Sequence, residues 1–428
     1  MTRVASRRST RVWTFVAFTA VGAALLFAGI SSYVRITGKG TDYNVFYLAG
    51  RTLAERPADL YHFQAPRGPT YTYIYPPLFA VLMSPLAALP LSASALAWFL
   101  LNAALFLHGA WILSRALASP PRRMELLAWI LILGAPFAVE NIFLGQVHGL
   151  IAYLMVRAFE LLRTGRSVGG AVWMAAASAI KLMPAVFGVY FLVRRDWKGL
   201  ASLALAGIAF TAIPPAVAVG PRPAVELLAE FAEMLVLPYV TLGISSHAIY
   251  DRTAARKTLH DQDFGALLVR LLGPGQEVAR LAGRAVAALV ALLLGVSMVA
   301  TWKRARDTAN GPGGLDVACS IYTVLSLLLS PRNRLAYWTV LIIPWSVLLA
   351  RLMAPATARS GRPIVLGTLL ASAPLLALSG LPVPAVQAVT LGFWGLLALW
   401  IGLVVLSSRE PRACPRALSE HPIGLAGT

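Results

Sequence analysis

One acidic residue lies just after the first long apolar segment of this chain. Asp42 follows residues 12–34 and belongs to the polar stretch of residues 40–44. A carboxylate at a membrane boundary is unfavourable unless it is solvated, paired or used in chemistry. Two compatible roles fit it. It could act as a general base that takes a proton from a hydroxyl, or as a helix cap that accepts N–H bonds of the first turn.

Three basic residues lie outside the predicted cytoplasmic turns and beside apolar segments. Lys181 is flanked by apolar residues on both sides, and Arg332 and Arg334 follow Pro331 in another turn. Cations at such positions pair with lipid phosphates or mark the site of an anionic ligand. The alternative is a snorkelling side chain that only reaches the membrane surface. That alternative fits either arginine singly better than it fits Lys181.

Polar side chains also gather at a third predicted external turn. Glu140 could be a second acid, and Gln146 and His148 could hydrogen-bond sugar hydroxyls. A solvated turn explains the same residues equally well. Upstream, Tyr75 precedes two prolines that restrict the backbone before them to extended forms. Its ring belongs either to an interfacial aromatic belt or to a wall that holds a lipid or sugar.

The composition is that of a membrane protein. Of the 428 residues, 58% are hydrophobic and 13% are charged, against roughly 25% charged in soluble domains. The formal net charge is +19, but the basic residues form short clusters between apolar spans, as topology determinants do. Nucleic-acid binding would need a continuous basic patch, so we expect no nucleic acid. The two cysteines, Cys319 and Cys414, predict neither a disulfide framework nor a metal site.

Apolar runs separated by basic turns predict an all-α polytopic membrane protein with about twelve transmembrane helices. Basic clusters place both termini in the cytoplasm, and the first span has no cleavage site after it. We expect one integral-membrane domain over residues 1–406, external loops at 35–77 and 221–280, and a basic cytoplasmic tail at 407–428. The predicted spans are residues 12–34, 78–117, 125–143, 146–163, 168–193, 199–220, 281–302, 315–330, 334–353, 364–381 and 385–406.

Two of these spans are expected to be short or broken. Residues 168–193 lie between two basic turns, so they should go out and back as two half-helices. The turn between the half-helices is then Lys181-Leu182-Met183-Pro184, in backbone that lines a protein-enclosed cavity. Residues 78–117 are expected to break at Pro85 and Pro90, because proline removes a backbone donor.

The second external loop contains a predicted interfacial helix and a weak metal motif. Residues 223–235 place glutamates on one helical face and leucine and phenylalanine on another. His260-Asp261-Gln262-Asp263 has D-x-D spacing, which we interpret as a cluster of loop charges, so no metal is expected. The chain has no Walker motif, no G-x-S-x-G and no H-E-x-x-H.

Short motifs follow one another in a distinctive order between residues 40 and 200. They are Asp42 with Val45-Phe46-Tyr47-x-Ala49-Gly50-Arg51, then Leu60-Tyr61, Tyr75-Pro76-Pro77-Leu78-Phe79, Gly145-Gln146-Val147 and Ala179-Ile180-Lys181-Leu182-x-Pro184. In these motifs the chain resembles glycosyltransferase family 87, a group of GT-C enzymes similar to polyprenol-phosphate-mannose-dependent mannosyltransferases. It departs from the family pattern at His148, where Asn is common, and at Arg332-Asn333-Arg334, where histidines often occur.

The resemblance implies a GT-C-type fold and an inverting transfer of a hexose from a polyprenyl-phosphate sugar, without a cofactor. Transfer would take place on the outer face of the plasma membrane, to a glycolipid or glycan acceptor, with Asp42 as base. We hypothesise that Lys181, Arg332 and Arg334 bind the donor phosphate and stabilise the charge that develops on it. The candidate sugar or acceptor contacts are Tyr47, Arg51, Tyr61, Tyr75, Glu140, Gln146 and His148.

A single carboxylate suffices for such a transfer. A phosphate leaving group needs no protonation, so the acid of the usual glycosidase pair can be dispensed with. Mannose and arabinofuranose both remain open as the sugar. Two further classes of function also remain open: a transporter of lipid or polysaccharide, and an envelope-assembly protein. A transporter should expose polar residues through the full membrane depth, whereas here they gather at one face, which favours the enzyme.

Overall fold

The computed structural model describes residues 2–63, 73–237, 264–272, 276–305, 312–330, 333–354, 361–380 and 389–409. These residues form helices and turns with no strand among them, which confirms the predicted all-α class. The α-helices are α1 (Thr2–Thr37), α2 (Asp42–Glu55), α3 (Pro77–Ala87), α4 (Leu91–Leu117), α5 (Arg123–Leu144), α6 (His148–Arg163), α7 (Ser167–Ile180), α8 (Phe187–Val193), α9 (Trp197–Val219), α10 (Pro221–Phe231), α13 (Phe264–Leu272), α14 (Gln276–Ala305), α15 (Pro312–Leu328), α16 (Ile342–Met353), α17 (Arg362–Ser379) and α19 (Leu391–Arg409). Short 3₁₀ or π turns are η1 (Pro57–Asp59), η2 (Pro120–Arg122), η3 (Met183–Val186), η4 (Ala232–Val236) and η6 (Leu335–Leu341).

Several of these helices can cross a membrane. In the described part of the chain, eight stretches are long and apolar enough: Val12–Thr37, Leu91–Leu117, Pro120–Leu144, Trp197–Val219, Leu281–Trp302, Leu335–Met353, Arg362–Ser379 and Leu391–Arg409. Four more apolar helices are shorter: Pro77–Ala87, Ser167–Ile180, Met183–Val193 and Gly314–Leu328. A full crossing takes about 20 helical residues. The polytopic class is therefore confirmed, while the expected number of spans stays a prediction.

The surfaces of the outer helices suit lipid contact. Val217 of α9 is 82% exposed, and Trp13 and Phe27 of α1 are 73% and 70% exposed. Large apolar side chains in such numbers on one surface mark contact with another apolar phase.

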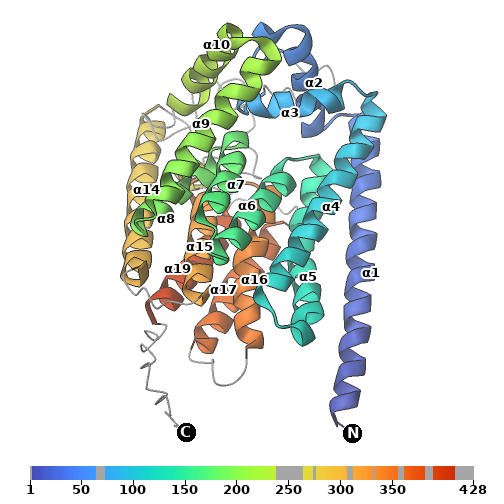
Figure 1. Cartoon of the computed structure of the whole chain (residues 1–428), viewed down its shortest axis with the longest axis vertical. Coiled ribbons are helices and arrows are strands. Elements are labelled where there is room, and N and C mark those ends of the chain that lie inside the picture. The colour runs from blue at the N-terminus through green and yellow to red at the C-terminus, as the bar shows by residue number, and fades with distance from the viewer. Residues whose placement is uncertain are drawn as a thin grey trace, which may run out of the picture.

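The two predicted external loops meet at one end of the bundle. Figure 1 shows α2, α3 and α10 together at the end opposite to the start of α1. His62 Nε2 lies 2.8 Å from Glu230 Oε1, and the ring of Tyr61 packs against Phe231. Leu227 and Phe231 are buried, as the predicted amphipathic helix requires. The described parts of the two loops therefore contact each other at this end of the bundle.

Of the two breaks predicted within residues 78–117, the one at Pro85 is wrong and the one at Pro90 is confirmed. Pro85 is inside α3, and the chain bends only at residues 88–90, where Pro90 precedes α4. The loss of one backbone hydrogen bond at Pro85 is therefore tolerated within the helix. Residues 78–117 are thus a short helix and a separate 27-residue helix, α4.

The break predicted at Lys181 is also confirmed. Helix α7 ends at Ile180, and Lys181 takes an extended conformation with φ −151° and ψ 126°. The turn η3 contains Pro184, and α8 follows it directly. This change of direction presents the Lys181 side chain at a helix end instead of on a lipid-facing surface.

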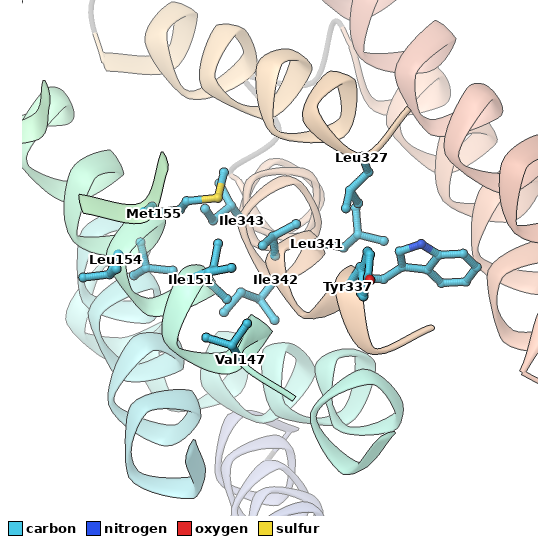
Figure 2. Packing of buried hydrophobic residues seen from close by; sticks show 14 of the residues in the cluster. Val147, Ile151, Leu154, Met155, Leu327, Tyr337, Leu341, Ile342 and Ile343 are labelled. Atoms are coloured by element: carbon cyan, nitrogen blue, oxygen red, sulfur yellow. The ribbon is translucent and has the colours of Figure 1, made fainter. Parts of the chain in front are cut away.

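Helix α6 is the centre of the packing around this break. It packs against α4, α7 and η6, and α4 also packs against α16. Figure 2 shows Ile151 and Met155 of α6, and Val147 just before it, in one buried layer with Ile342 and Ile343 of α16. The first turn of α6, which carries His148, is therefore held from several sides.

A buried amide network joins α4, α5 and α6. Asn102 Nδ2 donates to the Trp98 carbonyl at 3.0 Å, and Asn141 Nδ2 donates to Asn102 Oδ1 at 3.0 Å. The Gly149 N–H donates to Asn141 Oδ1 at 3.1 Å. A buried polar network that is satisfied in this way fixes the register of its helices.

Asn141→Leu should destabilise the fold, because it removes the partner of the Gly149 N–H and of Asn102 Oδ1. An unsatisfied buried group costs about 1–3 kcal/mol. We expect a lower melting temperature in detergent solution, with Leu100→Ala, which is 55% exposed on α4, as a neutral control. Equal melting temperatures for the two variants would refute the role of the network.

Candidate active site

Thr41, not Asp42, caps the helix that carries the predicted base. Thr41 is extended, and its Oγ1 accepts a hydrogen bond from the Tyr43 N–H at 3.3 Å. In return, the Thr41 N–H donates to Asn44 Oδ1 at 2.7 Å. The capping prediction for Asp42 is therefore wrong, because the residue before it completes the capping box. Asp42 is the first residue of α2.

Gln146 holds the Asp42 carboxylate. Its Nε2 donates to Asp42 Oδ2, although 104 residues separate the two in sequence. Its Oε1 faces the Tyr75 hydroxyl at 3.5 Å. The amide thus links the predicted base to the tyrosine before the two prolines. This contact brings together three of the predicted site residues.

Gly145 makes this contact possible. It ends α5 with φ +67°, a conformation that glycine adopts without a Cβ penalty. A Cβ at this position would lie 2.5 Å from the Cβ of Tyr43. The Trp98 Nε1 donates to the Gly145 carbonyl at 3.0 Å and holds the turn in place. The backbone of the turn therefore lies directly against the first turn of α2.

Three rings surround the Lys181 ammonium. Its Nζ is 2.9 Å from His148 Nε2 and 3.4 Å from the ring centre of Tyr337. The rings of His148 and Tyr337 stack at 3.8 Å, and the Tyr75 ring is 5.6 Å from the Lys181 Nζ. A lysine ammonium only donates hydrogen bonds, so His148 Nε2 accepts and Nδ1 carries the proton. Two π faces and one lone pair thus fix the ammonium.

Glu140 and Arg334 belong to the same region. Glu140 lies near the end of α5 and is half-buried. The charges of Arg35, Arg334 and Asp42 act on its carboxyl group. Arg35 also lies 4.3 Å from the ring centre of Phe143. Two carboxylates are therefore accompanied by two arginines at this end of the bundle.

The loop tyrosines build the wall behind the site. The Tyr61 hydroxyl donates to the Tyr75 carbonyl at 3.1 Å, and the Tyr73 hydroxyl donates to the Pro76 carbonyl at 2.9 Å. Burial raises the pKa of Tyr61 and Tyr73, and it raises the pKa of Tyr43 to about 12. These phenols are neutral at ordinary pH and act here as hydrogen-bond donors. Tyr61 acts on the site through the Tyr75 backbone.

Two predicted contacts are not brought to Asp42. The Tyr47 hydroxyl donates to the Leu89 carbonyl at 2.9 Å, and Arg51 pairs with Glu55 at 3.0 Å. Tyr47 and Arg51 lie on a different face of α2 from Asp42. Arg332 and the His260–Asp263 cluster lie outside the described residues. Within the described ranges no group of three His, Cys, Asp or Glu side chains could hold a metal ion.

Sequence reasoning missed Tyr337 and Arg35. Tyr337 lies three residues after Arg334 in η6, and its ring contacts both Lys181 and His148. An aromatic residue soon after a polar turn is an ordinary interfacial feature, so nothing local distinguished it. Arg35 lies near the end of α1, where a basic residue is also an ordinary feature of a membrane boundary.

Comparison with known proteins gives a family. The sequence profile of glycosyltransferase family 87 matches residues 73–331, which is more than half of the chain. The match includes Tyr75, Glu140, Gln146, His148 and Lys181, whereas Asp42 precedes it. No solved structure matches the chain.

Two curated mannosyltransferases are similar in sequence. The polyprenol-phosphate-mannose-dependent alpha-(1-2)-phosphatidylinositol mannoside mannosyltransferase of Mycobacterium tuberculosis is 28% identical over 299 residues, covering 64% of this chain and 61% of that protein. The corresponding pentamannoside mannosyltransferase of Mycolicibacterium smegmatis is 26% identical over 303 residues, covering 69% of this chain and 66% of that protein. The alignments thus span less than two thirds of either relative.

Gly145→Ala should displace the start of α2. The new methyl group would overlap Tyr43, and overpacking of this kind costs about 1–3 kcal/mol beyond the strain of a positive φ. Gly165→Ala is the matched control, because Gly165 has φ +76° and nothing within 4 Å of an added Cβ. We expect Gly145→Ala to lower the melting temperature more than Gly165→Ala does. An equal loss would show that the close approach to Tyr43 is unimportant.

Proposed function

Because the chain belongs to glycosyltransferase family 87, we propose that it is a membrane glycosyltransferase that uses a polyprenyl-phosphate sugar as donor. The sugar is a hexose, with mannose as first choice, because the two curated relatives are named for mannose transfer. The acceptor is a lipid-linked sugar or glycan. The enzyme needs no cofactor, since the phosphate of the donor is itself the leaving group.

One observation carries the proposal. A chain of contacts links the Asp42 carboxylate to the Lys181 ammonium. Gln146 Nε2 donates to Asp42 Oδ2, and its Oε1 accepts from the Tyr75 hydroxyl at 3.5 Å. The Lys181 Nζ lies 5.6 Å from the centre of the Tyr75 ring. A base and a cation at the same end of a membrane bundle are what transfer from a lipid phosphate requires.

The proposed reaction is a single displacement at the anomeric carbon. Asp42 takes the proton of the acceptor hydroxyl as the hydroxyl oxygen forms its bond to that carbon. The bond between the anomeric carbon and the phosphate oxygen breaks, and the phosphate leaves with the electron pair. The configuration at the anomeric carbon is therefore inverted. Gln146 orients the carboxylate so that the proton transfer occurs at a fixed atom.

Lys181 stabilises the departing phosphate. Its ammonium is already held by His148 and Tyr337, so little reorganisation is needed when negative charge develops on the leaving oxygen. Arg334 lies at the same end of the molecule, where its charge acts on Glu140, and it assists as a second cation. Tyr75 and Glu140 line the sugar position between the base and the cations.

The site faces the outside of the plasma membrane in this proposal. Basic clusters at the predicted cytoplasmic turns, among them Arg122-Arg123 and Arg194-Arg195, fall at the opposite ends of the helices. Both termini are then cytoplasmic, and the polyprenyl chain of the donor lies in the bilayer beside the bundle. Membrane lipids are therefore obligatory partners.

Asp42→Asn should reduce transfer by about 10²–10⁴-fold, because the amide cannot accept the proton. The assay is incubation of the purified full-length protein with labelled polyprenyl-phosphate mannose and membrane lipid extract, followed by detection of labelled product. Asp59→Asn is the control, because Asp59 lies in the same loop and is 48% exposed beside Arg56. Substantial turnover by Asp42→Asn would reject Asp42 as the base. Absence of transfer by the unaltered protein with any polyprenyl-linked sugar would favour a transporter or assembly role.

Lys181→Met should lower kcat by about 10²-fold, as the loss of one electrostatic contact to a developing charge does. The change keeps the length and apolar stem of the side chain. Lys198→Met on the exposed start of α9 controls for the loss of a charge. If both variants keep the kcat of the unaltered protein, Lys181 has no part in leaving-group stabilisation.

A further inference from the structure

A pocket lies on the side of α2 that faces away from Asp42. It has a volume of about 460 Å³ and lies between α2, the end of α3 and the turn into α4. This volume is within the range of about 300–1,000 Å³ typical of ligand sites. Among its lining residues are Tyr47, Arg51, Glu55, Ser84, Leu89 and Pro90.

The pocket is separate from the candidate active site. Arg51 follows Asp42 by nine residues, which is about two and a half helical turns, so the two side chains leave α2 on opposite faces. Asp42 is held by Gln146 from α5, whereas Tyr47 donates to the Leu89 carbonyl before α4. Tyr47 and Arg51 therefore line a different place in the molecule from Asp42.

Opposite charges line this pocket. The Arg51 Nε and Nη2 both donate to Glu55 Oε1, at 3.2 and 3.0 Å, and the two side chains are 51% and 53% exposed. An exposed pair of this kind contributes little to stability. A ligand that carries both charges can therefore open the pair and match each partner at little cost.

The wall of the pocket is rigid. A Cβ at Gly50 would lie 2.8 Å from the backbone of Met83, so α2 and α3 are in close contact there. Ser84 Oγ donates to the Gly50 carbonyl at 3.2 Å across the same contact. The pocket is thus built into the packing of two helices.

The pocket also has an exposed apolar side chain. Leu89 lines it and is 41% exposed. Helices α2 and α3 lie at the end of the bundle in Figure 1, above the long spans. The pocket therefore combines a pair of opposite charges with an apolar side chain.

We propose that this pocket binds the headgroup of a zwitterionic phospholipid. Arg51 binds the phosphate, Glu55 binds the cationic amine, and an acyl chain lies against Leu89. A purely anionic headgroup would meet the Glu55 carboxylate without a compensating charge, so the pair of opposite signs favours the zwitterion. The proposal is independent of the transferase reaction.

The test is lipid binding to the full-length protein in detergent, measured by native mass spectrometry with phosphatidylethanolamine and with phosphatidylglycerol. We expect the unaltered protein to retain phosphatidylethanolamine preferentially. Arg51→Gln should weaken that binding by about tenfold, because it loses a charge-assisted hydrogen bond. Glu55→Gln should remove the preference between the two lipids.

Arg56→Gln is the matched control. Arg56 lies next to α2 with a side chain 72% exposed, and it does not line the pocket. It should bind phosphatidylethanolamine as the unaltered protein does, and all variants should share one melting temperature because the changed side chains are exposed. Undiminished binding by Arg51→Gln, or equal retention of both lipids by the unaltered protein, would overturn the proposal. Asp42→Asn should leave lipid binding intact, which separates this site from the reaction.

Discussion

The contact between the Gln146 amide and the Asp42 carboxylate is the interaction on which the site depends. It joins the start of α2 to the turn between α5 and α6. The contact requires Gly145, because any side chain there would enter the space of Tyr43. It also requires Thr41, which satisfies the end of α2 and so leaves the Asp42 side chain available to Gln146.

Interruptions of helices, more than the helices themselves, assemble the polar groups. The backbone is not helical just after Leu144, just after Ile180 and just before Leu335. Gln146, Lys181 and Arg334 lie at these three places. Backbone that is not helical is tolerated at membrane depth only when protein encloses it. The packing of α6 against its neighbours provides that enclosure, so the same burial that stabilises the bundle also positions its cations.

Helix α2 divides its roles between two faces. One face carries Asp42 toward the interior and buries Phe46, Ala49 and Leu53. The other carries Tyr47 and Arg51 toward a pocket that Leu89 also lines. The motif that spans Asp42 and Arg51 therefore contributes side chains to two places in the molecule, although its residues lie on one short helix.

Hydropathy and basic turns were enough to predict the all-α membrane class, the break at Lys181 and the surface helix at the second loop, because these depend on local composition and on proline. Motifs in the chain also predicted Asp42, Gln146, His148 and Lys181 as site residues. The tertiary structure alone decided that Thr41 caps α2, that the Tyr337 ring contacts Lys181, and that Tyr47 and Arg51 lie away from Asp42. Each of these depends on which face of a helix meets a segment distant in sequence, and no periodicity within a single segment contains that information.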